Sequence, residues 1–281
     1  MRSKLFVPAS RPELFDKAVN SAADALSFDL EDAVAPERKE WARACLADWL
    51  AEPQRASQLK QYAKKIIVRV NAVETPHFAG DVAALAGLPV DILNVPKTES
   101  AAAVRAAIDA ATRAGFEGGF LVNVETPLGL ARAAELAGAH ERVAGLQLGL
   151  ADLCEPLGID RYQPRTLHAL MLALRLAAGA AGKFAMDAAY ARVSDPEGFR
   201  AEARLARSLG LLGKSCIHPS QVAIANDVFG FSAAEIDAAE RIVAASRVHP
   251  GVGAFLLDGK MIDAPFVRRA REVLLAAGRP A

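Results

Sequence analysis

Short apolar runs alternate with longer segments rich in Ala, Leu, Arg and Glu along most of this sequence. Such alternation is typical of βα units arranged around a parallel sheet. Eight runs have the length and composition of buried strands: residues 4–8, 25–30, 66–71, 92–96, 119–124, 145–150, 184–186 and 213–217. Helices are expected between them, for example over residues 101–114, 129–137, 167–181 and 196–209. Eight strand–helix repeats within about 220 residues match the size of a TIM barrel.

We therefore predict an α/β fold, a (β/α)8 barrel formed by residues 1–218. An open doubly wound sheet is the main alternative, but no glycine-rich fingerprint follows the first strand. The run 184–186 is the weakest, so a count of seven strands is a second alternative. Residues 219–281 are expected to form C-terminal helices, a glycine-rich loop at 251–253 and a turn at residues 258–259. This extension either packs on the barrel or acts as a lid over a site in its own or a neighbouring subunit.

The composition argues against several classes of protein. Lys plus Arg and Asp plus Glu number 33 each, so the net charge is zero and no nucleic-acid partner is expected. Three cysteines without CxxC spacing argue against a disulfide framework and fit a reducing compartment. The N-terminal apolar run is too short for a signal peptide, and the Ala-rich stretch 169–181 is too short to cross a bilayer. We expect a cytoplasmic protein with no membrane role.

Charged residues follow the carboxyl ends of three expected strands: Arg69, Glu125 and Asp152. In a parallel barrel that edge is where active sites are built. Two carboxylates on neighbouring strand ends, completed by water and substrate oxygens, are a usual way to hold Mg²⁺. The alternative for each carboxylate is that it caps the helix that follows. Arg69 offers bidentate donors for a carboxylate or a developing oxyanion, and its alternative is a structural ion pair.

Further charged residues are expected at the same rim. Glu31 and Asp32 end the second strand and could orient Arg69 or hold metal-bound water, whereas Asp29 is expected to be structural and Asp32 could instead cap a helix. Lys97 could complement these acids. Two other residues with weaker signals lie near the rim: Lys17, which could meet a phosphate, and His218, which precedes a proline and could equally be structural.

These residues lie in short motifs whose order and spacing resemble the citrate lyase β-subunit-like family, also called the HpcH/HpaI aldolase superfamily. The group includes malyl-CoA, citramalyl-CoA and citryl-CoA lyases. The motifs cover nearly the whole chain, and they are Leu5-Phe6-Val7-Pro8, Asp29-Leu30-Glu31-Asp32-Ala33-Val34, Arg69-Val70-Asn71, Pro96-Lys97, Glu125-Thr126, Gly149 to Asp152, Gly213-Lys214, Ile217-His218-Pro219 and Gly259-Lys260-Met261-Ile262-Asp263.

The resemblance implies a TIM barrel that cleaves a 3-hydroxyacyl-CoA by a retro-Claisen reaction with Mg²⁺, or with Mn²⁺. Glu125 and Asp152 match the family's metal ligands, with Glu125 also near the substrate, and Arg69 matches its substrate-oxygen clamp. Asp263 matches an aspartate on a C-terminal lid that reaches a neighbouring subunit. Residues at positions that touch the CoA ester in relatives are Phe6, Lys17, Ile217 and His218. The family implies a homo-oligomer, a trimer or a dimer of trimers.

Two departures from the family pattern leave the acyl group open. Ala151 stands where many relatives have Glu beside the metal ligand, and Ala9 stands where Gly is common. Three alternative functions also stay open: a metal-dependent aldolase of free 2-oxo-4-hydroxy acids, an acyl-CoA thioesterase on the same scaffold, and a non-catalytic subunit that binds CoA or a metabolite. The sequence does not show whether the protein works with an acyl-carrier partner.

Overall fold

The computed structural model of the protein describes residues 1–248 and 253–280, so the first two residues of the expected glycine-rich loop at 251–253 lie outside the described part. The chain divides into two compact units, Met1–Phe229 and Gly230–Ala281. The helix after Pro219 belongs to the first unit. Within the described ranges, no helix is both long and apolar enough to span a bilayer.

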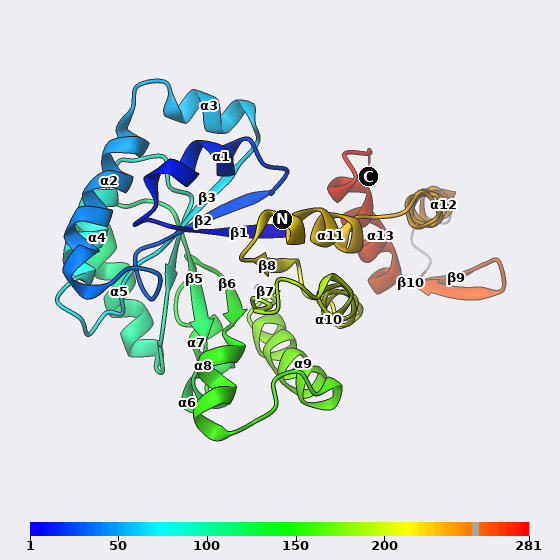
Figure 1. Ribbon diagram of the computed structural model, residues 1–281. Helices are drawn as coiled ribbons and strands as arrows, with labels where there is room; N and C mark the ends of the chain where they lie inside the picture. The colour runs from blue at the N-terminus through cyan, green and yellow to red at the C-terminus, as the bar shows by residue number, and fades with distance from the viewer. Residues whose placement is uncertain (249–252, 281) are drawn as a thin grey trace. The chain divides into compact units, whose positions relative to one another are not determined.

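The first unit is built on a closed sheet of eight parallel strands, which Figure 1 shows at the centre of that unit. The strands pair in the order β7-β6-β5-β4-β3-β2-β1-β8, and a parallel bridge between Asp187 and Lys214 joins the two ends. The prediction of a (β/α)8 barrel with eight strands is therefore confirmed. The barrel strands are β1 (Ser3–Pro8), β2 (Ala25–Asp29), β3 (Lys65–Arg69), β4 (Ile92–Val95), β5 (Gly119–Val124), β6 (Val143–Leu148), β7 (Phe184–Met186) and β8 (Lys214–Cys216).

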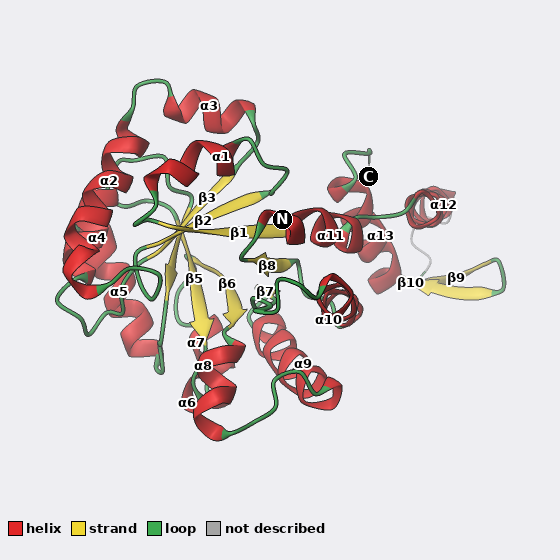
Figure 2. Ribbon diagram, in the orientation of Figure 1, coloured by secondary structure: helices red, strands yellow, loops and turns green. Residues whose placement is uncertain are grey.

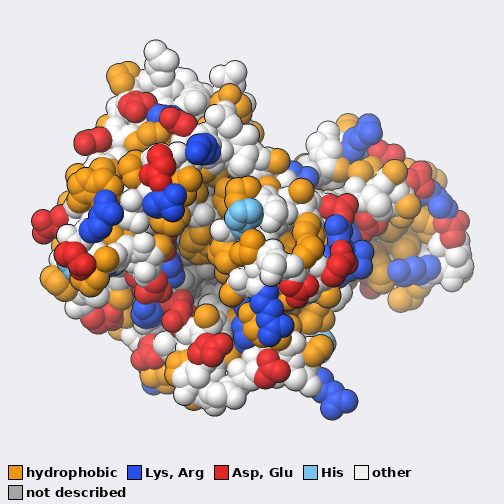
Figure 3. Space-filling model, viewed as in Figure 1, with side chains coloured by type: hydrophobic (Ala, Val, Ile, Leu, Met, Phe, Trp, Pro, Cys, Tyr) orange, Lys and Arg blue, Asp and Glu red, His pale blue; other side chains and the backbone are white. Residues whose placement is uncertain are grey.

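Helices surround the barrel strands, as Figure 2 shows in red around yellow. They are α1 (Phe15–Val19), α2 (Lys39–Ala51), α3 (Arg55–Gln61), α4 (Phe78–Leu85), α5 (Ala101–Arg113), α6 (Pro127–Ala131), α7 (Ala133–Ala137), α8 (Leu150–Cys154), α9 (Pro164–Ala180), α10 (Pro196–Ser208) and α11 (Pro219–Phe229). On the face of this unit seen in Figure 3, acidic and basic side chains are interspersed, in keeping with the balanced charge.

The core lies between the strands and the helices because both faces of a parallel sheet are covered. All five residues of β2 are buried, and Phe28 on that strand meets Phe15 of α1 and Trp49 of α2 with ring centroids 5.0 and 5.2 Å apart. Burying an aromatic side chain of this size contributes about 1.5–3 kcal/mol. This aromatic cluster fixes the first two helices against the strand whose end carries the acidic motif.

The seam between β7 and β8 is closed mainly by buried charges. Both strands have three residues, and besides the bridge at Asp187 a backbone bond from Leu212 N to Ala185 O, 2.8 Å long, joins their segments. Beside it, Lys214 Nζ lies 2.6 Å from Asp187 Oδ2 and 2.7 Å from Glu202 Oε1. Arg161 donates to both oxygens of Glu202 at 2.6 and 2.7 Å. Two cations and two carboxylates thus offset one another where the sheet has few ladder bonds.

The second unit is a pair of helices with a β-hairpin. It contains α12 (Ala233–Val248), β9 (Ala254–Leu257), β10 (Lys260–Asp263) and α13 (Ala264–Ala276). The expected turn at residues 258–259 joins the two strands, and both of its residues have positive φ, 51° and 75°. The helices share a small apolar core around Val243 and Leu274.

Replacing Lys214 with Met is expected to destabilise the protein by about 3–5 kcal/mol, because Asp187 then stays buried without a cation and Glu202 keeps only Arg161. Burial raises the pKa of Asp187 to about 6 from an ordinary 3.8, so its contribution to stability is present below pH 3.8 and is lost as pH rises through 6. Without the positive charge of Lys214, burial should raise the pKa of Asp187 further. The loss of stability should therefore be larger at pH 8, where Asp187 must be ionised, than at pH 5.

Denaturant unfolding at the two pH values measures this effect. Lys65→Met is the matched control, since Lys65 forms an exposed pair with Asp91 and its loss should cost about 0–1 kcal/mol at either pH. If the two substitutions lower the free energy of unfolding equally, the buried charges do not stabilise the junction of β7 and β8.

Candidate active site

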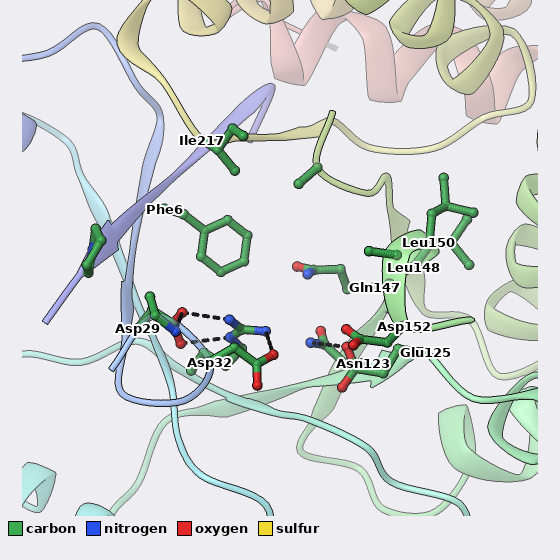
Figure 4. A pocket seen from close by; sticks show the side chains of 16 residues that line it. Phe6, Asp29, Asp32, Asn123, Glu125, Gln147, Leu148, Leu150, Asp152 and Ile217 are labelled. Atoms are coloured by element: carbon green, nitrogen blue, oxygen red, sulfur yellow. Dashed lines mark hydrogen bonds and ion pairs between the residues drawn. The ribbon is translucent and has the colours of Figure 1, made fainter. Parts of the chain in front are cut away.

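A cavity of about 470 Å³ lies at the carboxyl ends of the barrel strands. Figure 4 shows its lining side chains converging from strands that are far apart in sequence. The lining residues are Phe6, Pro8, Asp29, Asp32, Ala33, Arg69, Asn123, Glu125, Gln147, Leu148, Gly149, Leu150, Ala151, Asp152, Ala189 and Ile217. The three charged strand ends expected from the sequence are therefore brought together at one cavity.

Glu125 and Asp152 form a carboxylate pair on one wall of this cavity (Figure 4). Glu125 is 2 % exposed, and it accepts hydrogen bonds from Lys97 N at 2.7 Å and from Asn123 Nδ2 at 3.2 Å. Burial raises the pKa of Glu125, and the nearby charge of Asp152 raises it further. The pair thus combines one buried and one exposed carboxylate whose charges repel.

Neither carboxylate caps a helix, which was the alternative for both. The N-cap of α6 is Thr126, whose hydroxyl accepts from Gly129 N at 3.0 Å. The N-cap of α8 is Gly149, and Asp152 lies in the first turn of that helix instead. A carboxylate there benefits from the partial positive charge of the helix N-terminus.

Gly149 is required by the position of Glu125. A Cβ atom on residue 149 would lie 2.4 Å from Glu125 Cβ and 2.7 Å from its Oε2. These separations are shorter than any stable contact between heavy atoms, so a side chain at this position would displace the carboxylate. The glycine after β6 is therefore explained by the close approach of two strand ends.

Arg69 lines the same cavity as the carboxylate pair and is held by three acids. Its Nε and Nη2 donate to the two oxygens of Asp29 at 2.8 and 2.6 Å. Its Nη1 lies 2.9 Å from Glu31 Oε2 and 3.4 Å from Asp32 Oδ2. Burial alone would lower the pKa of Arg69, but the bonds and charge of Asp29 raise it, so the guanidinium is a permanent cation. The structural ion pair is real, and it also orients the group at the cavity.

Lys97 completes this cluster from the end of β4. Its Nζ lies 2.8 Å from Glu31 Oε1 and 3.2 Å from Asp32 Oδ1, and its backbone is in the left-handed region with φ of 52°. Such strain in a non-glycine residue is common at functional sites, and here it accompanies the hydrogen bond from Lys97 N to Glu125. Burial raises the pKa of Glu31 to about 7. The contacts expected for Glu31, Asp32 and Lys97 are present.

The barrel interior beneath the cavity carries a second polar pair. Lys4 on β1 is fully buried, and its Nζ donates a short hydrogen bond to Gln147 Oε1 on β6. The same Nζ lies 4.0 Å from the centroid of the Phe6 ring. Burial, and next the charge of Arg69, lower the pKa of Lys4 well below its ordinary value. Neither Lys4 nor Gln147 was expected at the site from the sequence.

The charges around the cavity leave room for a cation. Five carboxylates line the cavity or contact its lining residues: Asp29, Glu31, Asp32, Glu125 and Asp152. The basic groups that do so are three, even when Lys4 is counted: Lys4, Arg69 and Lys97. Within the described ranges, no group of three or more His, Cys, Asp or Glu forms a ready metal cage. A site of two carboxylates with open positions suits Mg²⁺, which keeps water and substrate oxygens among its ligands.

Of the other residues expected at the site, some line the cavity and some do not. Phe6 and Ile217 line the cavity. Lys17 on α1 and His218 are exposed and are not among its lining residues. His218 Nδ1 instead accepts from Ser220 N at 3.2 Å, the structural role that was its alternative. Asp263 lies at the end of β10 in the second unit, and its Oδ1 is buried with no partner among the described residues.

Comparison with known proteins gives relatives over the whole chain. Residues 2–219 match the model of the HpcH/HpaI aldolase/citrate lyase family. A (3S)-malyl-CoA thioesterase of Cereibacter sphaeroides is 39 % identical, covering 98 % of this chain and 94 % of that protein. The citrate lyase subunit beta of Leuconostoc mesenteroides subsp. cremoris is 32 % identical over 98 % of this chain and 93 % of its own length.

The fold also matches solved structures. The protein CitE from Mycobacterium tuberculosis, solved in complex with magnesium, acetoacetate and coenzyme A, superposes with a TM-score of 0.77. It is 35 % identical, and the match covers 99 % of this chain and all of that one. A citrate lyase beta subunit from the same organism, complexed with oxaloacetate and magnesium, gives a TM-score of 0.68 at 35 % identity, covering 81 % of this chain and 96 % of that one.

Proposed function

The chain belongs to the HpcH/HpaI aldolase/citrate lyase family of enzymes, and we propose that it cleaves the carbon–carbon bond of a short 3-hydroxyacyl-CoA thioester. The products are acetyl-CoA and an oxoacid. The observation that carries this proposal is that Arg69 and the Glu125–Asp152 pair line one cavity. A cation site and a permanent guanidinium in the same cavity suit a substrate that carries both a carboxylate and a hydroxyl near its thioester.

Glu125 and Asp152 are the residues that would hold a divalent metal, Mg²⁺ or Mn²⁺. The fit rests on their repulsion within a cavity whose carboxylates outnumber its basic groups, and related structures contain magnesium. A bound Mg²⁺ supplies Lewis acidity to a substrate carboxylate and hydroxyl and lowers the cost of removing the hydroxyl proton. Asn123 and the backbone N–H of Lys97 orient Glu125 for this role.

Arg69 stabilises the negative charge that develops on a substrate oxygen when the bond breaks. Asp29 fixes the guanidinium in a bidentate grip, so little reorganisation is needed during the reaction. From the family resemblance we assign to Asp263 the exchange of a proton with the carbon of the departing acetyl-CoA enolate. In the same proposal Asp263 comes from a neighbouring chain in a trimer or a dimer of trimers.

Hydrolysis of the thioester is the second candidate function. It is favoured by the identity of 39 % to a (3S)-malyl-CoA thioesterase. In that reaction water attacks the thioester carbonyl, and the products are free CoA and an intact hydroxy acid. The two functions therefore differ in the bond that breaks: a carbon–carbon bond in the lyase reaction and the carbon–sulfur bond of the thioester in hydrolysis.

A panel of malyl-, citramalyl- and citryl-CoA, with and without Mg²⁺, tests the proposal. Carbon–carbon cleavage releases acetyl-CoA and an oxoacid without free thiol, whereas hydrolysis releases free thiol without an oxoacid. We expect Mg²⁺-dependent release of acetyl-CoA from at least one substrate. Release of thiol alone assigns the thioesterase, and no turnover of any thioester rejects both functions.

Arg69→Lys is expected to lower kcat on the best substrate by about 10²–10³, because a point charge cannot keep the bidentate grip of Asp29 or aim at the oxyanion. The measurement is steady-state kinetics of acetyl-CoA release. Arg11→Lys, at an exposed residue paired with Glu13, is the matched control and should leave kcat unchanged. A kcat within threefold of wild type in Arg69→Lys would remove Arg69 from the mechanism.

Asp152→Asn is expected to weaken Mn²⁺ binding at pH 7.5 by at least tenfold, because one of two anionic ligands is lost. In the wild type the raised pKa of Glu125 lets protons compete with the metal at a higher pH than for an ordinary glutamate, so affinity should fall as the solution is acidified. Electron paramagnetic resonance of free Mn²⁺ measures both effects. Asp160→Asn is the control, and equal affinity in the two variants would contradict the assignment.

A further inference from the structure

Gln147 places an uncommitted hydrogen-bond donor in the active-site cavity. The side chain comes from β6, and the residue is 4 % exposed. Its Oε1 accepts from Lys4 Nζ, which leaves Nε2 as the group available to the cavity. Within residues 1–248 and 253–280, no hydrogen-bond acceptor is found for Nε2. Figure 4 shows this amide in the space between Phe6 and Asp152.

Lys4 fixes which end of the amide is available. An ammonium group has donors and no acceptor, so a protonated Nζ donates to Oε1, which is the arrangement in the structure. Lys4 is itself held in place by complete burial and by the face of the Phe6 ring 4.0 Å away. The amide is therefore held with its oxygen towards the barrel interior and its nitrogen towards the ligand space.

The other side-chain hydrogen-bond donors of the lining residues, those of Arg69 and Asn123, are already engaged by carboxylates. Arg69 is engaged by Asp29, Glu31 and Asp32, and Asn123 Nδ2 donates to Glu125. In the proposed function, the carboxylate and the hydroxyl-derived oxygen of the oxoacid half would meet Arg69 and the metal ion that Glu125 and Asp152 would hold. Gln147 Nε2 is then the donor that remains for the other substituent on the carbonyl carbon of the oxoacid.

We propose that Gln147, positioned by Lys4, selects acyl groups whose oxoacid half carries a further carboxylate, as in citryl-CoA, over groups with a methyl in its place, as in citramalyl-CoA. This inference rests on the proposed function of the site and names its substrate class. A methyl group leaves the buried N–H without an acceptor, and sites built to bond a polar substituent reject analogues that lack it. Lys4 is a positioning residue, and Gln147 is the group that contacts the ligand.

Binding of the oxoacid products tests the inference without CoA chemistry. Isothermal titration with oxaloacetate and with pyruvate, each in the presence of Mg²⁺, gives two dissociation constants and their ratio. The wild type should prefer oxaloacetate. Gln147→Met, which keeps the length of the side chain, should weaken oxaloacetate binding by about tenfold to hundredfold and leave pyruvate binding within twofold.

Lys4→Met separates positioning from a purely structural role. Lys4→Met should lower the preference for oxaloacetate over pyruvate by a smaller factor than Gln147→Met does. In the double variant it should change this preference little beyond the effect of Gln147→Met, because Lys4 acts through the amide. Asn94→Leu is the matched control, since Asn94 is a buried amide of the barrel interior with no partner among the described residues and does not line the cavity. Its ratio should equal that of the wild type.

Gln147→Glu serves as a second variant, because it keeps the shape of the side chain, removes the donor and should lower the ratio at least as far as Met does. Thermal melts confirm folding of each variant. The inference is overturned by a wild type that binds pyruvate as tightly as oxaloacetate, by one that binds neither, or by a ratio unchanged in both Gln147 variants. If no CoA thioester is cleaved but the ratio still depends on Gln147, the proposed function fails, while the recognition of the additional carboxylate by Gln147 holds.

Discussion

The bidentate ion pair between Arg69 and Asp29 is the interaction on which the site depends. Both groups are largely buried, so each needs the other to offset the cost of leaving water. The pair joins the ends of β2 and β3, and its remaining charge recruits Glu31, Asp32 and, through them, Lys97. Since the backbone of Lys97 bonds to Glu125, one chain of contacts connects the guanidinium to the carboxylate pair.

The fold and the outline of the site could be predicted from the sequence because each depends on a local pattern. All eight strands appear where apolar runs of the right length were found, including the weakest at Phe184–Met186. In a parallel barrel the carboxyl ends of the strands lie on the same rim, so the sequence alone places Arg69, Glu125 and Asp152 close together.

What could not be predicted depends on side-chain direction and on pairings across the barrel. Asp29 was expected to be structural, yet it is the principal partner of Arg69, because the register sets those two residues side by side. Lys4 and Gln147 are 143 residues apart and meet only after the barrel closes. The inward positions of Lys4 and Gln147, polar residues within apolar strands, were a signal for both, since a buried polar group needs a partner.

The charged seam has a consequence for how the barrel opens. β7 and β8 are the shortest strands of the barrel, and three backbone hydrogen bonds join their segments, from Leu212, Asp187 and Ser215, so local separation there breaks few ladder bonds. Amide hydrogens at this seam should therefore exchange with solvent through smaller fluctuations than those of the long central strands β5 and β6. Ile217 directly follows β8 and lines the cavity, so a fluctuation of the seam reaches the cavity wall.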